Sequence, residues 1–245
     1  MNRDLAILTT QRCNEKCEYC DVPNIKNPKD INLDIYLKYI DIIQDFYEEF
    51  SLTGGEIGLL NEDVLNVIFD ALRKPVKLNT NGLFVKKGYY EKYKDKIGEM
   101  WYHIIRDDGV IEIEKEDLTY IIIKHRKNID QVDKIVEKYN HLNTRVVETS
   151  LKNKNRTDLL LHDIDSFVYP PIGCRLNTKM FDAVNGAWMY CCESYSQIPK
   201  IPLDSIEPHE FLRLNKCPEY ELCHTCMKIK RYRKTNIKRA IYEKI

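Results

Sequence analysis

Short apolar segments alternate with segments of helical periodicity through the first 150 residues, and this alternation constrains the fold more than any other feature. In the first helical segment, Leu33, Tyr36, Ile40 and Ile43 recur at spacings of three and four. Strands separated by helices pair in parallel, and both faces of such a sheet are buried. The sequence therefore predicts an α/β fold. The predicted strands, with the turns that follow them, are residues 5–10, 50–55, 76–82, 101–109, 118–125 and 144–150.

Asparagines mark the starts of two further predicted helices. One of them follows Asn61. A separate, Tyr-rich helix without such a signal is expected near residues 89–97. Asn128, with Gln131 three residues later, predicts a capped helix that runs through Tyr139. In folds of this class, ligands gather at the carboxyl ends of the strands. Motifs that follow the strands are therefore the first place to look for function.

The chain changes character after about residue 165. Six of the nine cysteines lie in the last 80 residues, together with irregular, Pro-containing segments and little apolar periodicity. Hydrophobic burial alone would not stabilise such a segment, and a bound metal would supply the missing free energy of folding. We therefore predict an α/β domain over residues 1–165 and a small cysteine-rich domain over residues 166–245.

The charge balance narrows the classes of partner. Lys and Arg number 38 and Asp and Glu number 38, so a neutral chain gives no reason to expect nucleic acid as a partner. No apolar run is long enough for a membrane span, and the N-terminus lacks a secretory signal. We expect a cytoplasmic protein, in which thiols stay reduced. Metal or redox chemistry is then a better interpretation of the cysteines than disulfides.

Three cysteines follow the first strand directly. Cys13, Cys17 and Cys20 have spacings of four and three, so their thiolates can converge on one face of an iron–sulfur cubane. Three ligands would leave the fourth iron open for another molecule. A structural zinc site closes with four protein ligands, and the alternative is a zinc knuckle completed by a distant Cys or His.

Glycine-containing motifs end the next two strands. The segment 51–57 contains Gly54, Gly55 and Glu56, and the segment 78–82 reads LNTNG. Glycines without side chains let the backbone approach a ligand closely. All three motifs belong to successive strand ends, which meet at one edge of a parallel sheet.

Cys-x3-Cys-x2-Cys after the first strand, followed by GGE and TNG, resembles the radical S-adenosylmethionine (SAM) superfamily. The resemblance implies a partial (β/α)6 barrel and a [4Fe–4S] cluster whose open iron binds the amino and carboxylate groups of SAM. In that family, one electron cleaves SAM to methionine and a 5′-deoxyadenosyl radical, which abstracts hydrogen from substrate.

The resemblance also implies roles for individual positions. The cluster ligands would be Cys13, Cys17 and Cys20, Tyr19 would pack near the adenine, Gly54, Gly55 and Glu56 would receive the methionine amino group, and Asn79 would contact methionine. The fourth strand departs from the family pattern, because Arg106 begins the sequence RDDG where relatives often have Ser-x-Asp-Gly. Arg106 would bind the methionine carboxylate or an acidic substrate, or be a solvated loop charge. Lys124 at the end of the fifth strand has the same alternatives.

A second group of cysteines lies in the predicted C-terminal domain. Two separated cysteines and a CxxC pair give four thiol ligands, which suit zinc or an iron–sulfur cluster equally well. Cys-x11-Gly-x4-Cys followed by CxxC resembles the auxiliary-cluster domain of radical SAM enzymes, in its short "twitch" form rather than the seven-cysteine SPASM form. The resemblance implies one auxiliary [4Fe–4S] cluster, with Cys192 and Cys217 as spare thiols. Its ligands would be Cys174, Cys191, Cys223 and Cys226.

An auxiliary cluster with four protein ligands cannot bind substrate, so its expected role is to accept the surplus electron of a substrate radical. We expect oxidation of a small molecule, such as a sugar, aminocyclitol or nucleoside derivative. The cysteine spacing and short length also resemble those of an aminocyclitol dehydrogenase. The alternatives are redox-neutral epimerisation or isomerisation, and peptide modification. Because the cluster motif begins at residue 13, we expect no winged-helix leader-recognition domain upstream, which makes peptide modification the weaker alternative.

Two other expectations concern partners. A flavodoxin- or ferredoxin-like protein is the expected electron donor. The basic segment 228–245, with eight Lys or Arg against one Glu, is interpreted as a solvated helix face, and docking of an acidic reductant, an acidic peptide or nucleic-acid phosphates is the alternative. The remaining alternative for the function of the whole protein is a non-catalytic zinc-binding interaction module, in which GGE and TNG would have no role.

Overall fold

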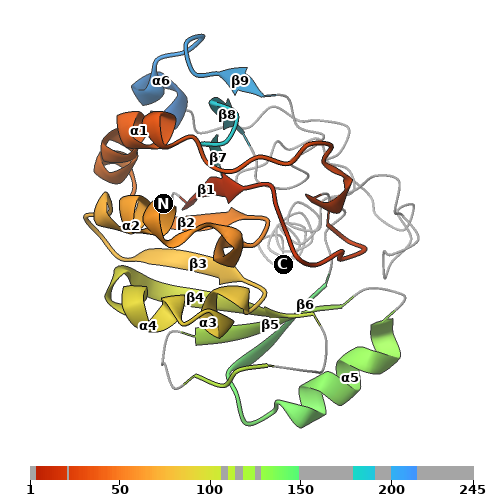
Figure 1. Cartoon of the computed structure of the whole chain (residues 1–245). Coiled ribbons are helices and arrows are strands. Elements are labelled where there is room, and N and C mark those ends of the chain that lie inside the picture. Colours follow the sequence, from red (N-terminus) through yellow and green to blue (C-terminus); the bar gives the residue numbers. More distant parts are fainter. Residues whose placement is uncertain are drawn as a thin grey trace, which may run out of the picture.

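In the computed structural model (Figure 1), the described residues form a central sheet of nine strands in the order β6-β5-β4-β3-β2-β1-β7-β8-β9. The structure describes residues 4–20, 22–105, 110–113, 118–124, 128–148, 179–190 and 200–213. Neighbouring strands from β1 to β6 are parallel, which confirms the predicted α/β fold. These strands are β1 (Asp4–Thr10), β2 (Glu49–Gly54), β3 (Val76–Thr80), β4 (Ile97–Ile104), β5 (Leu118–Lys124) and β6 (Thr144–Glu148).

Helices connect the parallel strands and cover one side of the sheet (Figure 1). In β1, Leu5 and Ile7 belong to the large apolar core, whereas Ala6 and Leu8 pack in a smaller cluster with Met180. Both faces of β1 are therefore buried, as its continuous apolar sequence predicts. The helices are α1 (Leu33–Phe46), α2 (Glu62–Asp70), α3 (Leu83–Lys86), α4 (Tyr89–Tyr93), α5 (Ile129–Lys138) and α6 (Pro208–Arg213).

Asparagine side chains cap α1 and α2, but not α5, where a cap was predicted. The side chains of Asn32 and Asn61 accept backbone N–H bonds at the starts of α1 and α2. Asn128 makes no such cap, and its Nδ2 donates instead to the Ile123 carbonyl at 2.8 Å. The predicted capping box at Asn128 is therefore wrong, because its amide ties α5 back to the preceding strand.

The Tyr-rich helix is shorter than predicted. It ends at Tyr93, a 3₁₀ turn follows over Lys94–Lys96, and β4 begins at Ile97 rather than at residue 101. Phe69 of α2 stacks on the Tyr93 ring, with 4.4 Å between centroids, so aromatic packing fixes this short helix against its neighbour.

Strands β7 (Lys179–Asp182), β8 (Ala187–Met189) and β9 (Ile201–Pro202) extend the sheet beyond β1 and were not predicted. β7 pairs in parallel with β1 and forms an antiparallel hairpin with β8. Gly186 in the hairpin turn has φ +67°, a conformation that favours glycine. These strands belong to the range 166–245, where we expect the second domain, and most of that range lies outside the described residues.

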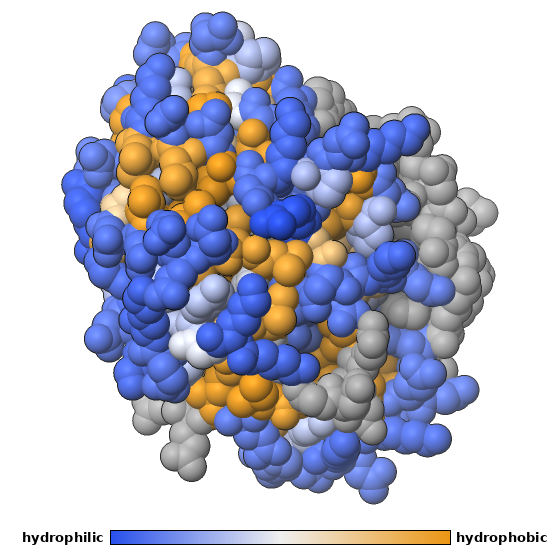
Figure 2. Space-filling view, viewed as in Figure 1, coloured by the Kyte–Doolittle hydropathy of each residue, from blue (hydrophilic) through white to orange (hydrophobic). Residues whose placement is uncertain are grey.

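The molecular surface is mixed in polarity. Figure 2 shows apolar side chains gathered over α1 and α2, where Leu37 is 46% exposed. None of the helices within the described ranges is long and apolar enough to cross a membrane.

Candidate functional site

The carboxyl ends of the parallel strands bring the predicted motifs together at one edge of the sheet. The cysteine loop leaves β1 at Thr10, and Gly54 ends β2 opposite Thr10 in the pairing register. The turn 80–82 follows β3 on the neighbouring side. The order β3-β2-β1 therefore places the three motifs side by side.

The three cysteines of the loop are half-buried and near one another. The Cys20 N–H donates to the Cys17 carbonyl at 3.1 Å, which folds the loop into a turn. Burial raises the pKa of Cys17 to about 11, and the charges of Cys20 and Cys13 add to the increase. Burial likewise raises the pKa of Cys13. A cation that binds all three sulfurs would relieve this repulsion between thiolates.

Gly54 and Gly55 let β2 touch the base of the cysteine loop. A Cβ atom on Gly54 would lie 2.3 Å from the Thr10 carbonyl oxygen, and one on Gly55 would lie 1.9 Å from that of Arg12. Gly54 also has φ +137°. The Gly55 N–H donates to Thr10 O at 2.7 Å. The close approach that the glycines permit is therefore made to the protein backbone itself, directly before Cys13.

Glu56 is 1% exposed, and its carboxylate accepts four hydrogen bonds. The donors are the backbone N–H groups of Gly58, Asn81 and Phe84 and the Thr80 hydroxyl. Burial raises the pKa of Glu56, and these four bonds oppose that rise. The side chain therefore ties the GGE segment to the TNG turn, and its backbone N–H ties the same segment to the Arg12 carbonyl at 2.8 Å.

Asn81 contacts a predicted cluster ligand, which the sequence analysis did not foresee. Its Nδ2 donates to the Cys13 sulfur at 3.7 Å and to Asn14 Oδ1 at 2.9 Å. Asn79, which carried the predicted methionine contact, lies within β3 and donates from Nδ2 to the Leu52 carbonyl at 3.4 Å. The contact of Asn79 with methionine stays a prediction. The signal for Asn81 was its place after the strand end, where a side chain can reach the neighbouring loop.

Arg12 anchors the start of the cysteine loop. Its guanidinium forms a two-bond pair with Asp30, at 2.8 Å from Nε and 2.5 Å from Nη2, and also donates to the Leu59 carbonyl. Thr10 donates its hydroxyl to the same Asp30 carboxylate at 2.7 Å. The planar guanidinium matches this fork–fork geometry. Both ends of the loop that contains the cysteines are therefore held together.

A cavity of about 380 Å³ lies beside the cysteine loop, at the ends of β4 and β5 and against α5. The cysteine loop lines one side with Cys17, Tyr19 and the charged residues Glu15, Lys16 and Glu18. The Tyr19 hydroxyl hydrogen-bonds to the Cys17 thiol. Burial raises the pKa of Tyr19, so its hydroxyl stays protonated. The facing wall is apolar, with Asn128 and Gln131 at its polar positions. The apolar residues are Ile104, Ile105, Ile122, Ile123 and Ile135.

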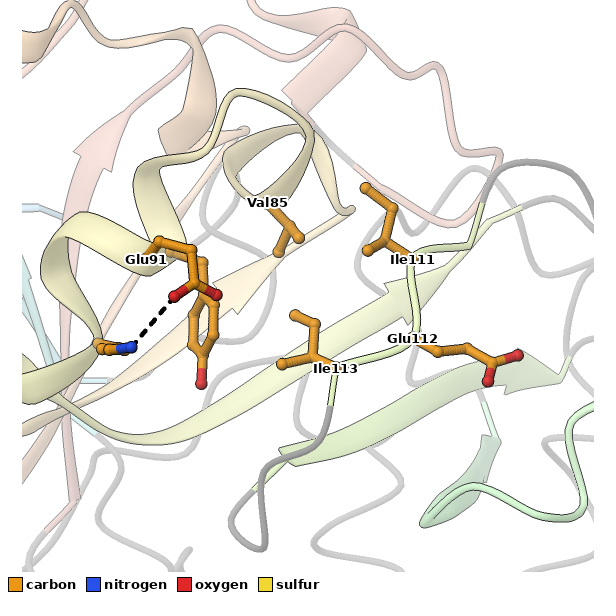
Figure 3. Close-up of a pocket in the computed structure, with 7 residues that line it drawn as sticks. Val85, Glu91, Ile111, Glu112 and Ile113 are labelled. Carbon is orange, nitrogen blue, oxygen red and sulfur yellow. Dashed lines mark hydrogen bonds and ion pairs between the residues drawn. The ribbon is translucent and has the colours of Figure 1, made fainter.

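A larger cavity of about 520 Å³ lies elsewhere, between α3, α4 and residues 111–113 (Figure 3). Val85, Ile111 and Ile113 face one another across it, and Glu91 pairs with Lys94 at its rim. Of the predicted site residues that the structure describes, none lines this cavity. We therefore place the candidate site at the cysteine loop.

The other predicted site residues are Lys124, Arg106 and those of the C-terminal range. Lys124 ends β5 and is half-buried. Arg106 and the basic segment 228–245 lie outside the described residues. So do the six C-terminal cysteines, which are Cys174, Cys191, Cys192, Cys217, Cys223 and Cys226.

The three thiols of the cysteine loop suit an iron–sulfur cluster in which one iron is left open for another ligand. Within the described part of the chain, no three Cys, His, Asp or Glu side chains are close enough to hold one metal ion. Zinc needs such a set, with each thiolate about 2.3 Å from the same ion. A [4Fe–4S] cluster instead binds each cysteine through a different iron, so its sulfurs lie further apart. The loop supplies three half-buried thiols, one for each of three irons.

Comparison with known proteins supports this interpretation. A family model for the radical SAM superfamily matches residues 7–151, which include the cysteine loop, the GGE segment and most of β1 to β6. A search of curated protein sequences finds no match.

Solved structures with a similar fold include three that contain SAM or a peptide. Native anSMEcpe with bound AdoMet is 12% identical, with a TM-score of 0.63 over 92% of this chain and 88% of its own. Streptococcus suis SuiB bound to precursor peptide SuiA is 14% identical, with a TM-score of 0.58 over 93% of this chain and 70% of its own. BtrN in complex with AdoMet and 2-DOIA is 12% identical, with a TM-score of 0.50 over 96% and 87%. At these identities the similarity concerns the fold.

Proposed function

This chain belongs to the radical SAM superfamily, and we propose that it cleaves SAM reductively with a [4Fe–4S] cluster held by Cys13, Cys17 and Cys20. The observation that carries the proposal is the arrangement of the site. Three neighbouring thiols lie at the carboxyl edge of a parallel sheet, next to a cavity of about 380 Å³. That volume falls within the usual range for small-molecule and cofactor sites.

Different residues around the cysteines would bind the methionine and the adenine parts of SAM. When bound, the cluster supplies the electron that cleaves SAM to methionine and a 5′-deoxyadenosyl radical, which removes a hydrogen atom from substrate. Gly54, Gly55 and Glu56 would present backbone groups to the methionine amino group, because the Glu56 carboxylate is already committed to four donors. Tyr19 and the isoleucines of the cavity would pack on the adenine and exclude water.

We further propose that the substrate is a small molecule that undergoes a two-electron oxidation. The substrate radical would lose a proton to solvent or a base and its surplus electron to an auxiliary cluster at Cys174, Cys191, Cys223 and Cys226. Two observations support this extension. The β7–β8 hairpin, with Gly186 at its turn, pairs Met180 with Met189, and in the sequence Cys174 precedes Met180 by six residues and Cys191 follows Met189 by two. The BtrN structure, which shares the fold, contains the small molecule 2-DOIA as well as AdoMet.

Iron and sulfide analysis after anaerobic reconstitution tests the cluster assignments. Wild-type protein should hold about eight irons per chain, and a Cys13→Ala, Cys17→Ala, Cys20→Ala variant about four, since each cluster contributes four. About four irons in wild type, falling to none in the variant, would remove the auxiliary cluster from the proposal and favour redox-neutral chemistry. Equal iron in both proteins would contradict the proposed SAM-binding cluster.

Peptide modification is the competing function, because the SuiB structure with a similar fold contains a precursor peptide. Anaerobic substrate screening with a flavodoxin- or ferredoxin-like electron donor distinguishes small-molecule oxidation from peptide modification. Oxidised small-molecule product formed in step with 5′-deoxyadenosine supports our proposal. Deuterium from water in an unoxidised product would instead indicate epimerisation.

A further inference from the structure

Asn81 is fixed by contacts that leave its amide little freedom. The Asn81 backbone N–H donates to Glu56 Oε2 at 2.7 Å, which anchors the residue to a buried carboxylate. Its Oδ1 accepts the Leu83 backbone N–H at 3.2 Å, in the manner of an Asx turn at the start of α3. The bond to Glu56 therefore fixes the position of the Asn81 backbone, and the bond from the Leu83 N–H fixes the position of the Asn81 side-chain oxygen.

This arrangement settles which way the amide points. Amide oxygen and nitrogen atoms are assigned from their hydrogen-bond partners. Because Oδ1 must face the Leu83 N–H, the NH₂ group faces the cysteine loop. Its Nδ2 then donates one hydrogen to the Cys13 sulfur, 3.7 Å away, and the other to Asn14 Oδ1, 2.9 Å away. The Cys13 sulfur also accepts the Glu15 backbone N–H at 3.4 Å.

Hydrogen bonds to cysteine sulfurs are one of the means by which a protein sets the reduction potential of an iron–sulfur cluster. A donor draws electron density from the sulfur and stabilises the more negative, reduced cluster. An amide fixed by the protein does so without reorganising when the electron arrives, and such outer partners also orient the ligand.

We propose that Asn81 is a positioning residue that raises the reduction potential of the SAM-binding cluster through its hydrogen bond to Cys13. The inference rests on the proposed function, since it requires that Cys13 hold that cluster. Asn81 acts on the cluster through the ligand and needs no contact with substrate.

The test is a redox titration of the reconstituted full-length protein. The reduced cluster is monitored by electron paramagnetic resonance, through the signal that Cys17→Ala lacks. Asn81→Ser keeps an oxygen that can accept the Leu83 N–H, but it removes the NH₂ donor. Its midpoint potential should fall below that of wild type. A tenfold smaller ratio of reduced to oxidised cluster at fixed applied potential corresponds to about 59 mV for one electron.

Asn14→Ala is the matched control, because it removes the other partner of the same NH₂ group and leaves the bond to sulfur. Its potential should stay near the wild-type value. Asn81→Asp, which keeps the size and the turn acceptor, replaces Asn81→Ser if the serine variant does not assemble its cluster. It should also titrate below wild type.

Two results would overturn the inference. One is an Asn81→Ser potential equal to that of wild type and Asn14→Ala. The other is failure of both Asn81 variants to bind iron while their apo proteins melt like wild type, which would make Asn81 a requirement for assembly rather than for potential. Absence of the Cys17-dependent signal from wild type would instead refute the proposed function.

Discussion

The carboxyl ends of β1 to β3 and those of β4 and β5 form two unlike halves of the same sheet edge. In the first half, Glu56 accepts four hydrogen bonds and Arg12 pairs with Asp30. In the second half, isoleucines line a cavity of about 380 Å³. Hydrogen bonds and an ion pair hold the loop that contains the cysteines, whereas the isoleucines of the cavity wall form an apolar surface against which a ligand can pack.

The difference shows how one edge can serve two parts of a single ligand. A charged, multi-centre group such as a cluster needs ligands at fixed positions, and buried polar networks supply that rigidity when they are satisfied. A flat, largely apolar group needs a dry slot with few polar contacts. Substitutions in the first half should therefore cost stability and iron, and those in the second half should cost SAM affinity.

Glu56→Ala should have the largest effect on stability. It leaves the N–H groups of Asn81, Gly58 and Phe84 without their acceptor in a buried place, and each orphaned donor costs about 1–3 kcal/mol. We expect the free energy of unfolding to fall by at least about 3 kcal/mol in denaturant titration. Glu62→Ala, at an exposed pair with Lys92, is the control and should change little. Equal stability of the two variants would contradict the role of Glu56 as the central tie.

Gly55→Ala should be next in size. The new Cβ would lie 1.9 Å from the Arg12 carbonyl oxygen, so β2 and the cysteine loop must separate. Such overpacking costs about 1–3 kcal/mol, and iron content after reconstitution should fall with it. Gly98→Ala, whose nearest neighbour would be a Pro75 side-chain atom at 3.2 Å, is the matched control. Full iron content in Gly55→Ala would show that the close approach is dispensable.

Ile105→Ala tests the apolar half. This half-buried side chain lines the cavity, and truncating it should weaken SAM binding about tenfold, because contacts of this size in an apolar pocket contribute about 1–3 kcal/mol. Iron content should remain at the wild-type level. Val146→Ala, at an exposed position on β6, serves as the comparison in equilibrium binding of SAM. Loss of iron with unchanged SAM affinity would reverse the assignment of the two halves.

Arg12→Ala should have the smallest effect on stability. The guanidinium and Asp30 side chains are 42% and 35% exposed, so solvent screens the pair despite its good geometry. We expect less than about 1 kcal/mol of coupling in a double-mutant cycle with Asp30→Asn. A coupling well above that value would mean that the pair carries more of the loop's rigidity than its exposure suggests.

The sequence predicted the parallel sheet because long apolar periodicity is the strongest local signal. It missed β7 to β9, which are only four, three and two residues long and owe their place to pairing with β1. Sequence alone also placed the strand-end polar contact at Asn79. The sulfur contact belongs to Asn81, because the strand continues to Thr80. The close contact of Gly55 with the Arg12 backbone was not predicted, because only the folded chain reveals it, and the approach of GGE to a ligand stays a prediction.

The most direct test of the central claim is formation of 5′-deoxyadenosine from SAM by reconstituted, chemically reduced protein under strict anaerobiosis. Wild-type protein should form it, and Cys17→Ala should form none, because one of the three thiols that hold the cluster is then missing. If wild-type protein with its full complement of iron and sulfide leaves SAM intact, or if Cys17→Ala forms 5′-deoxyadenosine at the wild-type rate, the account is contradicted.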